Sequence, residues 1–112
     1  MVKIEVVIQP NKLENAREAL KNIGIDGLTV SEVRGHGRQK GHKEVYRGRE
    51  YEVDLLHKTK IELVTTDARK DEVIAALVEA VRTGAIGDGK IFVWPVLEVI
   101  RIRDDSRGEA AL

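Results

Sequence analysis

One short pattern of residues occurs twice in this chain of 112 residues, and it constrains the fold more than any other feature. Residues 3–7 have the sequence KIEVV, and residues 60–64 have the closely similar sequence KIELV. In both segments apolar and charged residues alternate, and this period of two predicts a β-strand with one buried face. The repetition predicts a domain built from two similar halves.

A helical segment follows each of these strands. Apolar residues recur at helical spacing in two stripes, Leu13, Ala16, Leu20 and Ile23 in the first and Ile74, Leu77, Val78 and Val81 in the second. Asn11 with Glu14 predicts a capping box at the start of the first helix, and Gly24 predicts its end. Asp67 predicts a cap for the second helix, and Gly84 predicts its end.

A further strand is predicted after each helix. The first spans 27–33, and the second spans 91–96 and continues through the alternating residues 99–103. Pro95 indicates that this last strand lies at an edge of the sheet or contains a bulge. The order β-α-β-β-α-β predicts the α+β ferredoxin-like split βαβ fold (βαββαβ), an antiparallel sheet with two helices on one face.

The face of such a sheet that the helices leave open has to be solvated or covered. We expect Val7, Val33 and Val64 to point toward this open face. Burial against another subunit would explain them, and so would an ordinary solvated sheet, because much of any protein surface is apolar.

The composition is that of one globular domain. It has 42% hydrophobic and 34% charged residues, and no apolar stretch approaches the ~20 residues that a membrane-spanning helix needs. Because there is no cysteine and no signal-peptide pattern, we expect a cytoplasmic protein. Lys and Arg number 19, as do Asp and Glu, and this balance argues against a generic nucleic-acid binder.

Basic side chains are nevertheless concentrated in one segment. Residues 34–60 hold eight Lys and Arg but only four Asp and Glu, together with all three histidines. Most of this segment, from Arg34 to about Leu55, lies between the second and third predicted strands, where a hairpin of about 2–5 residues would be enough. A connection of this length inside a compact domain is usually functional or disordered.

A glycine-rich segment, TGAIGDGK at 83–90, follows the second predicted helix. Residues 84–90 match the phosphate-loop pattern G-x-x-x-x-G-K, but a phosphate loop runs from a strand into a helix, and this segment runs from a helix into a strand. The phosphate-loop interpretation therefore fails. The segment is either a glycine turn whose N–H groups surround an anion, or simply a helix end followed by a tight turn.

Cations placed near this turn favour a polyphosphate ligand. They are Lys90 in the turn, Arg38 and Lys58 beside the long loop, and Arg101 and Arg103 on one side of the last predicted strand. A solvated strand face would explain the last two arginines equally well.

Other kinds of site have less support. His36, His42 and His57 lack the tight spacing of a zinc site, and the chain has neither a cysteine nucleophile nor a G-x-S-x-G motif. An RNA-binding module of this topology would need aromatic residues on its central strands, and segments 2–8 and 59–65 have none.

Two motifs in register carry a family resemblance, YRGREY at 46–51 and TGAIGDGKIFV at 83–93. They resemble the T-loop and B-loop signatures of the nitrogen-regulatory PII signal-transduction family (GlnB/GlnK-like). GHGRQKGH at 35–42 and VIRIR at 99–103 are also similar to the family. The resemblance covers the whole chain without a gap.

The resemblance implies a single PII-like domain over residues 1–112, with a T-loop at about 36–55, a B-loop at about 82–90 and a C-terminal segment at about 101–112. It also implies a homotrimer that binds ATP or ADP in the clefts between subunits, with the arginines at 101 and 103 supplied by the neighbouring subunit. The implied nucleotide-binding residues are Thr29, Gly35, Gly37, Arg38, Glu62, Val64, Ile86, Gly87, Asp88, Gly89, Lys90, Arg101 and Arg103.

The second implied effector is 2-oxoglutarate, bound with Mg²⁺ that Gln39 and the ATP phosphates hold. The implied 2-oxoglutarate-binding residues are Gly37, Gln39, Lys40, Gly41, Lys58 and Gly87. The T-loop would then change conformation with the bound ligands. Three departures from the family pattern bear on effector binding or modification, namely Gln9, Arg49 and His57.

The implied role of the T-loop is to contact other proteins. Arg47 is a candidate to enter the pore of an ammonium transporter, and Tyr51 is the residue that a nucleotidyltransferase would modify. We therefore expect a PII-type nitrogen, carbon and energy signalling protein that regulates ammonium transporters or nitrogen-metabolism enzymes.

Such a protein would be no enzyme beyond a weak ATPase side activity. It would bind no nucleic acid and would reach a membrane only through a transporter. The alternatives are a slow ATP-hydrolysing enzyme that uses the same cleft, and an RNA-binding split βαβ module.

Overall fold

The computed structural model describes residues 1–37, 42–46, 48–53 and 55–112, with the backbone alone at 42–46 and 49–53. Its strands and helices are β1 (Val2–Ile8), α1 (Leu13–Asn22), β2 (Thr29–Gly35), β3 (His42–Tyr46), β4 (Arg49–Val53), β5 (Leu56–Thr65), α2 (Lys70–Val81) and β6 (Lys90–Pro95). Short 3-10 turns occupy Pro10–Lys12, Asp67–Arg69 and Gly108–Ala111. Within these described residues, no helix has the length and hydropathy to cross a membrane.

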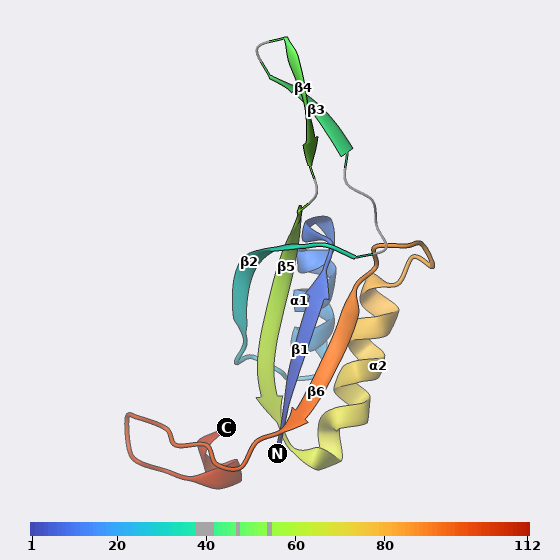
Figure 1. Cartoon of the computed structure of the whole chain (residues 1–112). Helices are drawn as coiled ribbons and strands as arrows, with labels where there is room; N and C mark the ends of the chain where they lie inside the picture. Colours follow the sequence, from blue (N-terminus) through green and yellow to red (C-terminus); the bar gives the residue numbers. More distant parts are fainter. Residues whose placement is uncertain (38–41, 47, 54) are drawn as a thin grey trace.

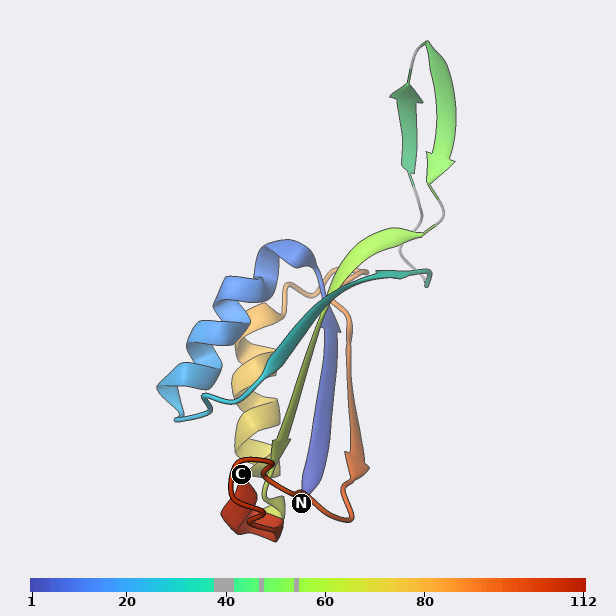
Figure 2. The same ribbon diagram turned by 90° about the vertical axis from the view of Figure 1, so that its left-hand side faces the viewer.

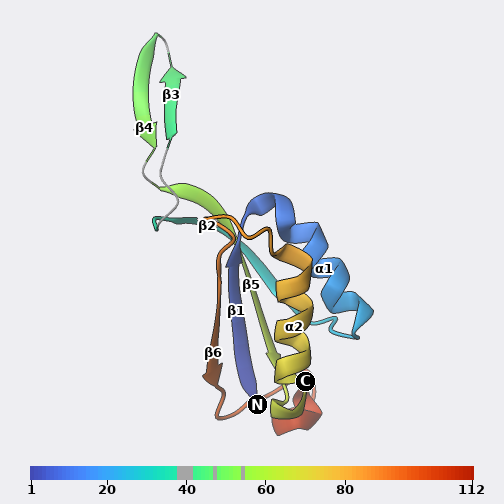
Figure 3. The ribbon, with the colours of Figure 1, turned by 90° about the vertical axis from the view of Figure 1, so that its right-hand side faces the viewer.

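The two strands with the repeated sequence, β1 and β5, lie side by side in the middle of an antiparallel four-stranded sheet. The strand order is β2-β5-β1-β6, and both helices cover one face (Figure 2). This confirms the predicted ferredoxin-like split βαβ fold. β6 lies at a free edge of the sheet (Figure 3), as Pro95 predicts.

The hydrophobic core lies between the sheet and the two helices. Along β1 and β5 every second side chain is buried, which is the alternation that the sequence predicts. The core residues are Ile4, Val6, Ile8, Ala16, Leu20, Ile61, Leu63, Val73, Leu77 and Val81. Fully burying a larger side chain of this kind contributes about 1.5–3 kcal/mol, so this layer holds the fold together. Val7, Val33 and Val64 are half-buried on the open face, as expected.

The helix starts differ from the prediction. α1 begins at Leu13 after a 3-10 turn that starts at Pro10, and no side chain caps it, so the predicted capping box is wrong. Glu14 instead accepts a hydrogen bond from Arg17 at 2.8 Å. The predicted cap at Asp67 is also wrong, because Asp67 lies in a 3-10 turn before α2. In both cases a 3-10 turn leads into the helix. Its backbone hydrogen bonds occupy N–H groups that a capping side chain would otherwise accept from.

The end of α1 is as predicted. Gly24 has a φ of 80°, and its N–H donates to the Lys21 carbonyl while the Ile25 N–H donates to the Leu20 carbonyl. This is a glycine-terminated helix end, in which carbonyls of the last turn accept hydrogen bonds from the residues after the helix. α2 ends at Val81, and Gly84, with a φ of 87°, lies in the turn that follows.

The predicted continuation of the last strand through 99–103 is wrong. β6 ends at Pro95, residues 102–104 form a turn, and Ile100 makes only an isolated bridge to Arg107. The Arg101 N–H donates to the Ser106 carbonyl at 2.9 Å, so the chain folds back on itself here. This segment therefore forms a local turn and not a strand, despite its alternating pattern.

The long connection between β2 and β5 contains the hairpin β3–β4, which the sequence does not predict. His42 pairs with Val53 at its base and Tyr46 with Arg49 at its far end. The hairpin projects beyond the end of the main sheet (Figure 1). The hairpin therefore lies apart from the helices and the four-stranded sheet.

Candidate functional site

The glycine-rich segment at 82–90, the B-loop, is anchored on the backbone of β1. Gly89 has a φ of 104°, and a Cβ atom there would lie 1.8 Å from the Val7 carbonyl oxygen. No side chain fits at that distance, so only glycine permits this contact. The contact places Lys90 opposite Val7 at the first residue of β6.

Asp88 closes the same loop from the other side. Its Oδ2 accepts hydrogen bonds from the N–H groups of Thr83 and Gly84, both at 2.8 Å, and its Oδ1 accepts one from the Thr83 hydroxyl at 2.5 Å. The Ala85 N–H in turn donates to the Thr83 hydroxyl oxygen at 3.2 Å. These hydrogen bonds, with that of the Thr83 hydroxyl the largest cause, lower the pKa of Asp88.

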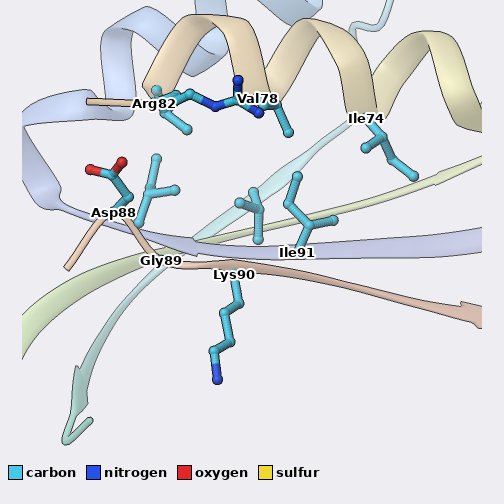
Figure 4. A pocket seen from close by; sticks show the side chains of 10 residues that line it. Ile74, Val78, Arg82, Asp88, Gly89, Lys90 and Ile91 are labelled. Atoms are coloured by element: carbon cyan, nitrogen blue, oxygen red, sulfur yellow. The ribbon is translucent and has the colours of Figure 1, made fainter. Parts of the chain in front are cut away.

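Lys90 points away from this hydrogen-bonded side of the loop. Figure 4 shows its ammonium on one side of β6, with Asp88, Ile91 and α2 on the other. No ion pair joins Lys90 to any residue in the described parts of the chain. A cation without a partner beside a glycine turn is suited to an anionic ligand.

A cavity of about 280 Å³ lies between α2 and the sheet, on the side of β6 away from the Lys90 ammonium (Figure 4). Its walls are mostly apolar: Val6, Ile8, Ile74, Val78, Val81 and Ile91. Arg82 and Asp88 also line this cavity, and the Lys90 ammonium points away from it.

The base of the long connection lies at the same end of the sheet as the B-loop (Figure 1). Gly35 pairs with Leu56, and a Cβ at Gly35 would contact the Lys58 side chain at 3.7 Å. Burial lowers the pKa of Lys58. The structure therefore brings Gly35, predicted to bind the nucleotide, close to Lys58, predicted to bind 2-oxoglutarate.

Several predicted site residues lie outside the described residues or lack a described side chain. Arg38, Gln39, Lys40, Gly41 and Arg47 fall among the residues that the structure does not describe, and Tyr51 is described only as backbone of β4. Ile86 lies in the B-loop and is 70% exposed. The predictions for this whole group stay predictions.

Thr29, Glu62 and Val64 lie on the open face of the sheet. Thr29 is opposite Glu62, which forms ion pairs with Lys3 and Lys60, each at 3.4 Å. Burial raises the pKa of Glu62, but these two lysines outweigh it and leave the pKa lowered. Hydrogen bonds to Glu5 and Glu62 raise the pKa of Lys60. The charges on this face are thus largely paired with one another.

The C-terminal segment that carries Arg101 and Arg103 lies at the opposite end of the fold from the B-loop (Figure 1). β6 alone separates the two ends by roughly 17 Å at about 3.3 Å per residue. Arg101 donates to the carbonyls of Ala110 and Leu112 at 3.1 and 3.2 Å and pairs with Asp104. Arg103 is exposed, and no described residue pairs with it.

One chain therefore divides the predicted nucleotide-binding residues into two groups. The first, at one end, comprises Gly35, Gly37 and residues 86–90. The second, toward the other end, comprises Thr29, Glu62, Val64, Arg101 and Arg103. The prediction that Arg101 and Arg103 stand on one side of a strand is wrong, because their segment is a turn.

Two contributions were missed by sequence reasoning. The first is Thr83, which lies in the glycine motif and donates its hydroxyl to Asp88. The five-residue spacing of the two side chains is the sequence feature that could have indicated this hydrogen bond. Lys3 lies over the Trp94 ring, 5.3 Å from its centroid, and links the open face to the edge strand. No sequence pattern indicates this pair, since it depends on the β1–β6 register.

Comparison with known proteins places the chain in a family. Residues 1–106 match the family described as Nitrogen regulatory protein P-II. The chain is 56% identical to the Nitrogen regulatory protein P-II of Pasteurella multocida and 53% identical to the Nitrogen regulatory protein P-II 1 of Escherichia coli K12, over all 112 residues of this chain and of each relative. The chain belongs to the nitrogen regulatory protein P-II family.

A solved structure agrees with this assignment. The crystal structure of Arabidopsis thaliana PII bound to citrate matches 99% of this chain and 91% of that chain, with a TM-score of 0.81 and 40% identity. The relatives are named as regulatory proteins, which fits a protein that is not an enzyme. The predicted family resemblance is confirmed.

The hydrogen bonds from Thr83 and Gly84 to the Asp88 carboxylate, called the Asp88 clamp below, predict a pH dependence of the stability of the fold. Because the pKa of Asp88 is lower in the folded chain, its ionised form stabilises the fold above the unfolded value of about 3.9, and this stabilisation is lost as the pH falls through the folded pKa. We expect Asp88→Asn to melt below the unmodified chain at pH 7, with the difference shrinking below about pH 4. Thermal unfolding by circular dichroism from pH 7 to pH 3 measures this. A difference independent of pH would contradict the role given to the carboxylate.

Proposed function

We propose that this chain is a PII-type signalling protein that binds ATP or ADP and 2-oxoglutarate at the interfaces of a homotrimer. Through its T-loop it would regulate ammonium transporters or nitrogen-metabolism enzymes in the cytoplasm. Membership of the P-II family supports the regulatory part of this proposal. The ligands and the assembly rest on the arguments that follow.

The observation that carries the proposal is the separation of two cationic groups that one polyphosphate would need. Lys90 lies beside the Gly87 and Gly89 turn at one end of the sheet, and Arg103 lies in the C-terminal segment at the other end; neither forms an ion pair with a described residue. A single chain cannot close both around one nucleotide, but the B-loop of one copy and the C-terminal segment of another can. A site of this kind exists only at a subunit interface.

Arg101 is less available than Arg103. To bind a phosphate it would exchange its contacts with Ala110, Leu112 and Asp104 for phosphate oxygens. Arg103 has no such contacts to give up within the described chain, so it is the better residue for a first test.

The open face of the sheet supports association. Phe92 and Trp94 are 44% and 41% exposed there, beside the paired charges of Lys3, Glu5, Lys60 and Glu62. A face with aromatic side chains and internally neutralised charge loses little on leaving water. Second and third copies of the chain would cover it.

The carboxylate effector would lie near the base of the T-loop. Lys58 supplies a cation beside Gly35, and Gln39 would hold Mg²⁺ together with the ATP phosphates. The Arabidopsis relative, whose structure is described as bound to citrate, adds support, since citrate and 2-oxoglutarate are both polycarboxylates. Arg47 and Tyr51 would be the partner-contact and modification residues of the T-loop.

Removing either cationic group should weaken nucleotide binding. We expect Lys90→Ala and Arg103→Ala each to raise the ATP Kd about 10- to 100-fold, because each loses a charge-assisted hydrogen bond to phosphate. Isothermal titration calorimetry measures this, with Lys21→Ala, an exposed cation on α1, as the control that should bind normally. Absence of ATP binding at millimolar concentration, or no effect of either variant, would overturn the proposed site.

Mixed oligomers test whether the two groups come from different copies. Lys90→Ala and Arg103→Ala chains would be unfolded together in equal amounts and refolded. Roughly one quarter of the interfaces should then combine an intact B-loop with an intact C-terminal segment and regain high affinity. If the two groups acted within one chain, no site would be restored.

The 2-oxoglutarate proposal predicts a dependence on the nucleotide. Because Mg²⁺ held by ATP would bind the effector, 2-oxoglutarate should bind at least about 10-fold more tightly with Mg-ATP than without it. Calorimetric titration with and without Mg-ATP provides the comparison, and Lys58→Ala should weaken binding in the presence of Mg-ATP. Equal affinity under both conditions would contradict the shared site.

A further inference from the structure

We propose that the Asp88 side chain is a positioning element of the B-loop, which holds the loop in its binding shape through Thr83 and Gly84, and that its carboxylate makes no contact with the nucleotide or its metal. This inference deepens the proposed function and rests on it. It explains why a carboxylate, which would repel an anion, lies in a loop that is proposed to bind one.

The hydrogen bonds of Asp88 leave it little capacity for a ligand. Three donors from Thr83 and Gly84 occupy both of its oxygens. A carboxylate has about four lone-pair positions, so most of them are filled within the loop. The carboxylate also lies on the α2 side of β6, whereas the Lys90 ammonium points to the opposite side (Figure 4).

A carboxylate near phosphate is unfavourable unless it contributes something else. Two like unit charges at close range repel one another even at the effective dielectric of a protein surface. Turning the charge toward Thr83 and Gly84 directs it to N–H donors and away from the anion. The cost of keeping an acid here is then offset by the order that it gives to the loop.

The loop is held at two points. Asp88, near the end of the loop, is tied to Thr83 and Gly84 at its start, and Gly89 packs on the Val7 carbonyl of β1. Gly87, between Ala85 and Asp88, has a φ of 103° that a side chain would strain. Backbone N–H groups held in fixed directions bind an anion without an ordering cost on binding. Removing one of the two ties should reintroduce that cost.

The rival role for Asp88 is that of a metal ligand, because acids near ATP phosphates often hold Mg²⁺. The two roles differ in one measurable respect. A metal ligand affects ATP affinity only when Mg²⁺ is present, whereas a positioning residue affects it equally with and without the metal.

The experiment compares ATP affinity by calorimetry in Mg²⁺ and in EDTA. We expect Asp88→Ala to weaken ATP binding roughly 10-fold or more in both conditions, Asp88→Asn to weaken it less, and Thr83→Val to weaken it in the same direction. The double variant should be no worse than Asp88→Ala, because both changes break one clamp. Glu79→Ala, an exposed acid on α2, is the control and should bind normally.

Amide hydrogen exchange of the nucleotide-free protein separates positioning from general destabilisation. The Thr83 and Gly84 amides should exchange faster in Asp88→Ala, while core amides of β1 and β5 keep their protection. A loss confined to Mg²⁺ conditions, unchanged affinity, or tighter binding from the removed charge would each overturn the proposal. If the unmodified chain bound no ATP, the proposed function would fail, and the exchange experiment would still report on the clamp.

Discussion

The contact between the backbone of Gly89 and the Val7 carbonyl is the constraint on which the rest of the site depends. It exists because β1 is a central strand whose carbonyl faces an incoming loop, and because residue 89 has no side chain. Once this contact is made, the register of β6 follows, with Lys90 opposite Val7 and Trp94 opposite Lys3. The position of the unpartnered lysine is thus a consequence of the fold's central strand.

The neutral total charge of the chain conceals an uneven distribution. On the open face, Lys3, Lys60, Glu5 and Glu62 neutralise one another. No described residue forms an ion pair with Lys90 in the B-loop or with Arg103 in the C-terminal segment, which lies at the opposite end. Paired charges suit a surface that other copies of the chain would cover. Unpaired ones suit a polyphosphate that bridges two copies. Association and ligand binding would therefore depend on each other, because the complete site appears only when two ends meet.

The sequence was sufficient for the features that depend on local pattern. The alternation of KIEVV and KIELV predicted the two central strands and the buried sides of β1 and β5, and Gly24 marked the end of α1. The family motifs identified the P-II family before any comparison. Membership in turn supports the expected regulatory role.

The features that the sequence missed depend on short-range turns and hydrogen bonds, which neither alternation nor capping patterns reveal. The alternation at 99–103 is as strand-like as that of β1, but the hydrogen bond from Arg101 to Ser106 folds it into a turn. Helix starts at Leu13 and Lys70 are set by 3-10 turns and not by capping side chains. The β3–β4 hairpin has no strong alternation, and the roles of Thr83 and Asp88 follow only from the closed loop.

The central claim is that one nucleotide is bound by two copies of this chain. A crystal structure of the protein with ATP tests it most directly. We expect the phosphate chain to lie between Lys90 and the Gly87–Gly89 turn of one copy and Arg103 of its neighbour, with the Asp88 carboxylate still bonded to Thr83 and Gly84. A nucleotide bound by a single chain, or bound away from the B-loop, would contradict it.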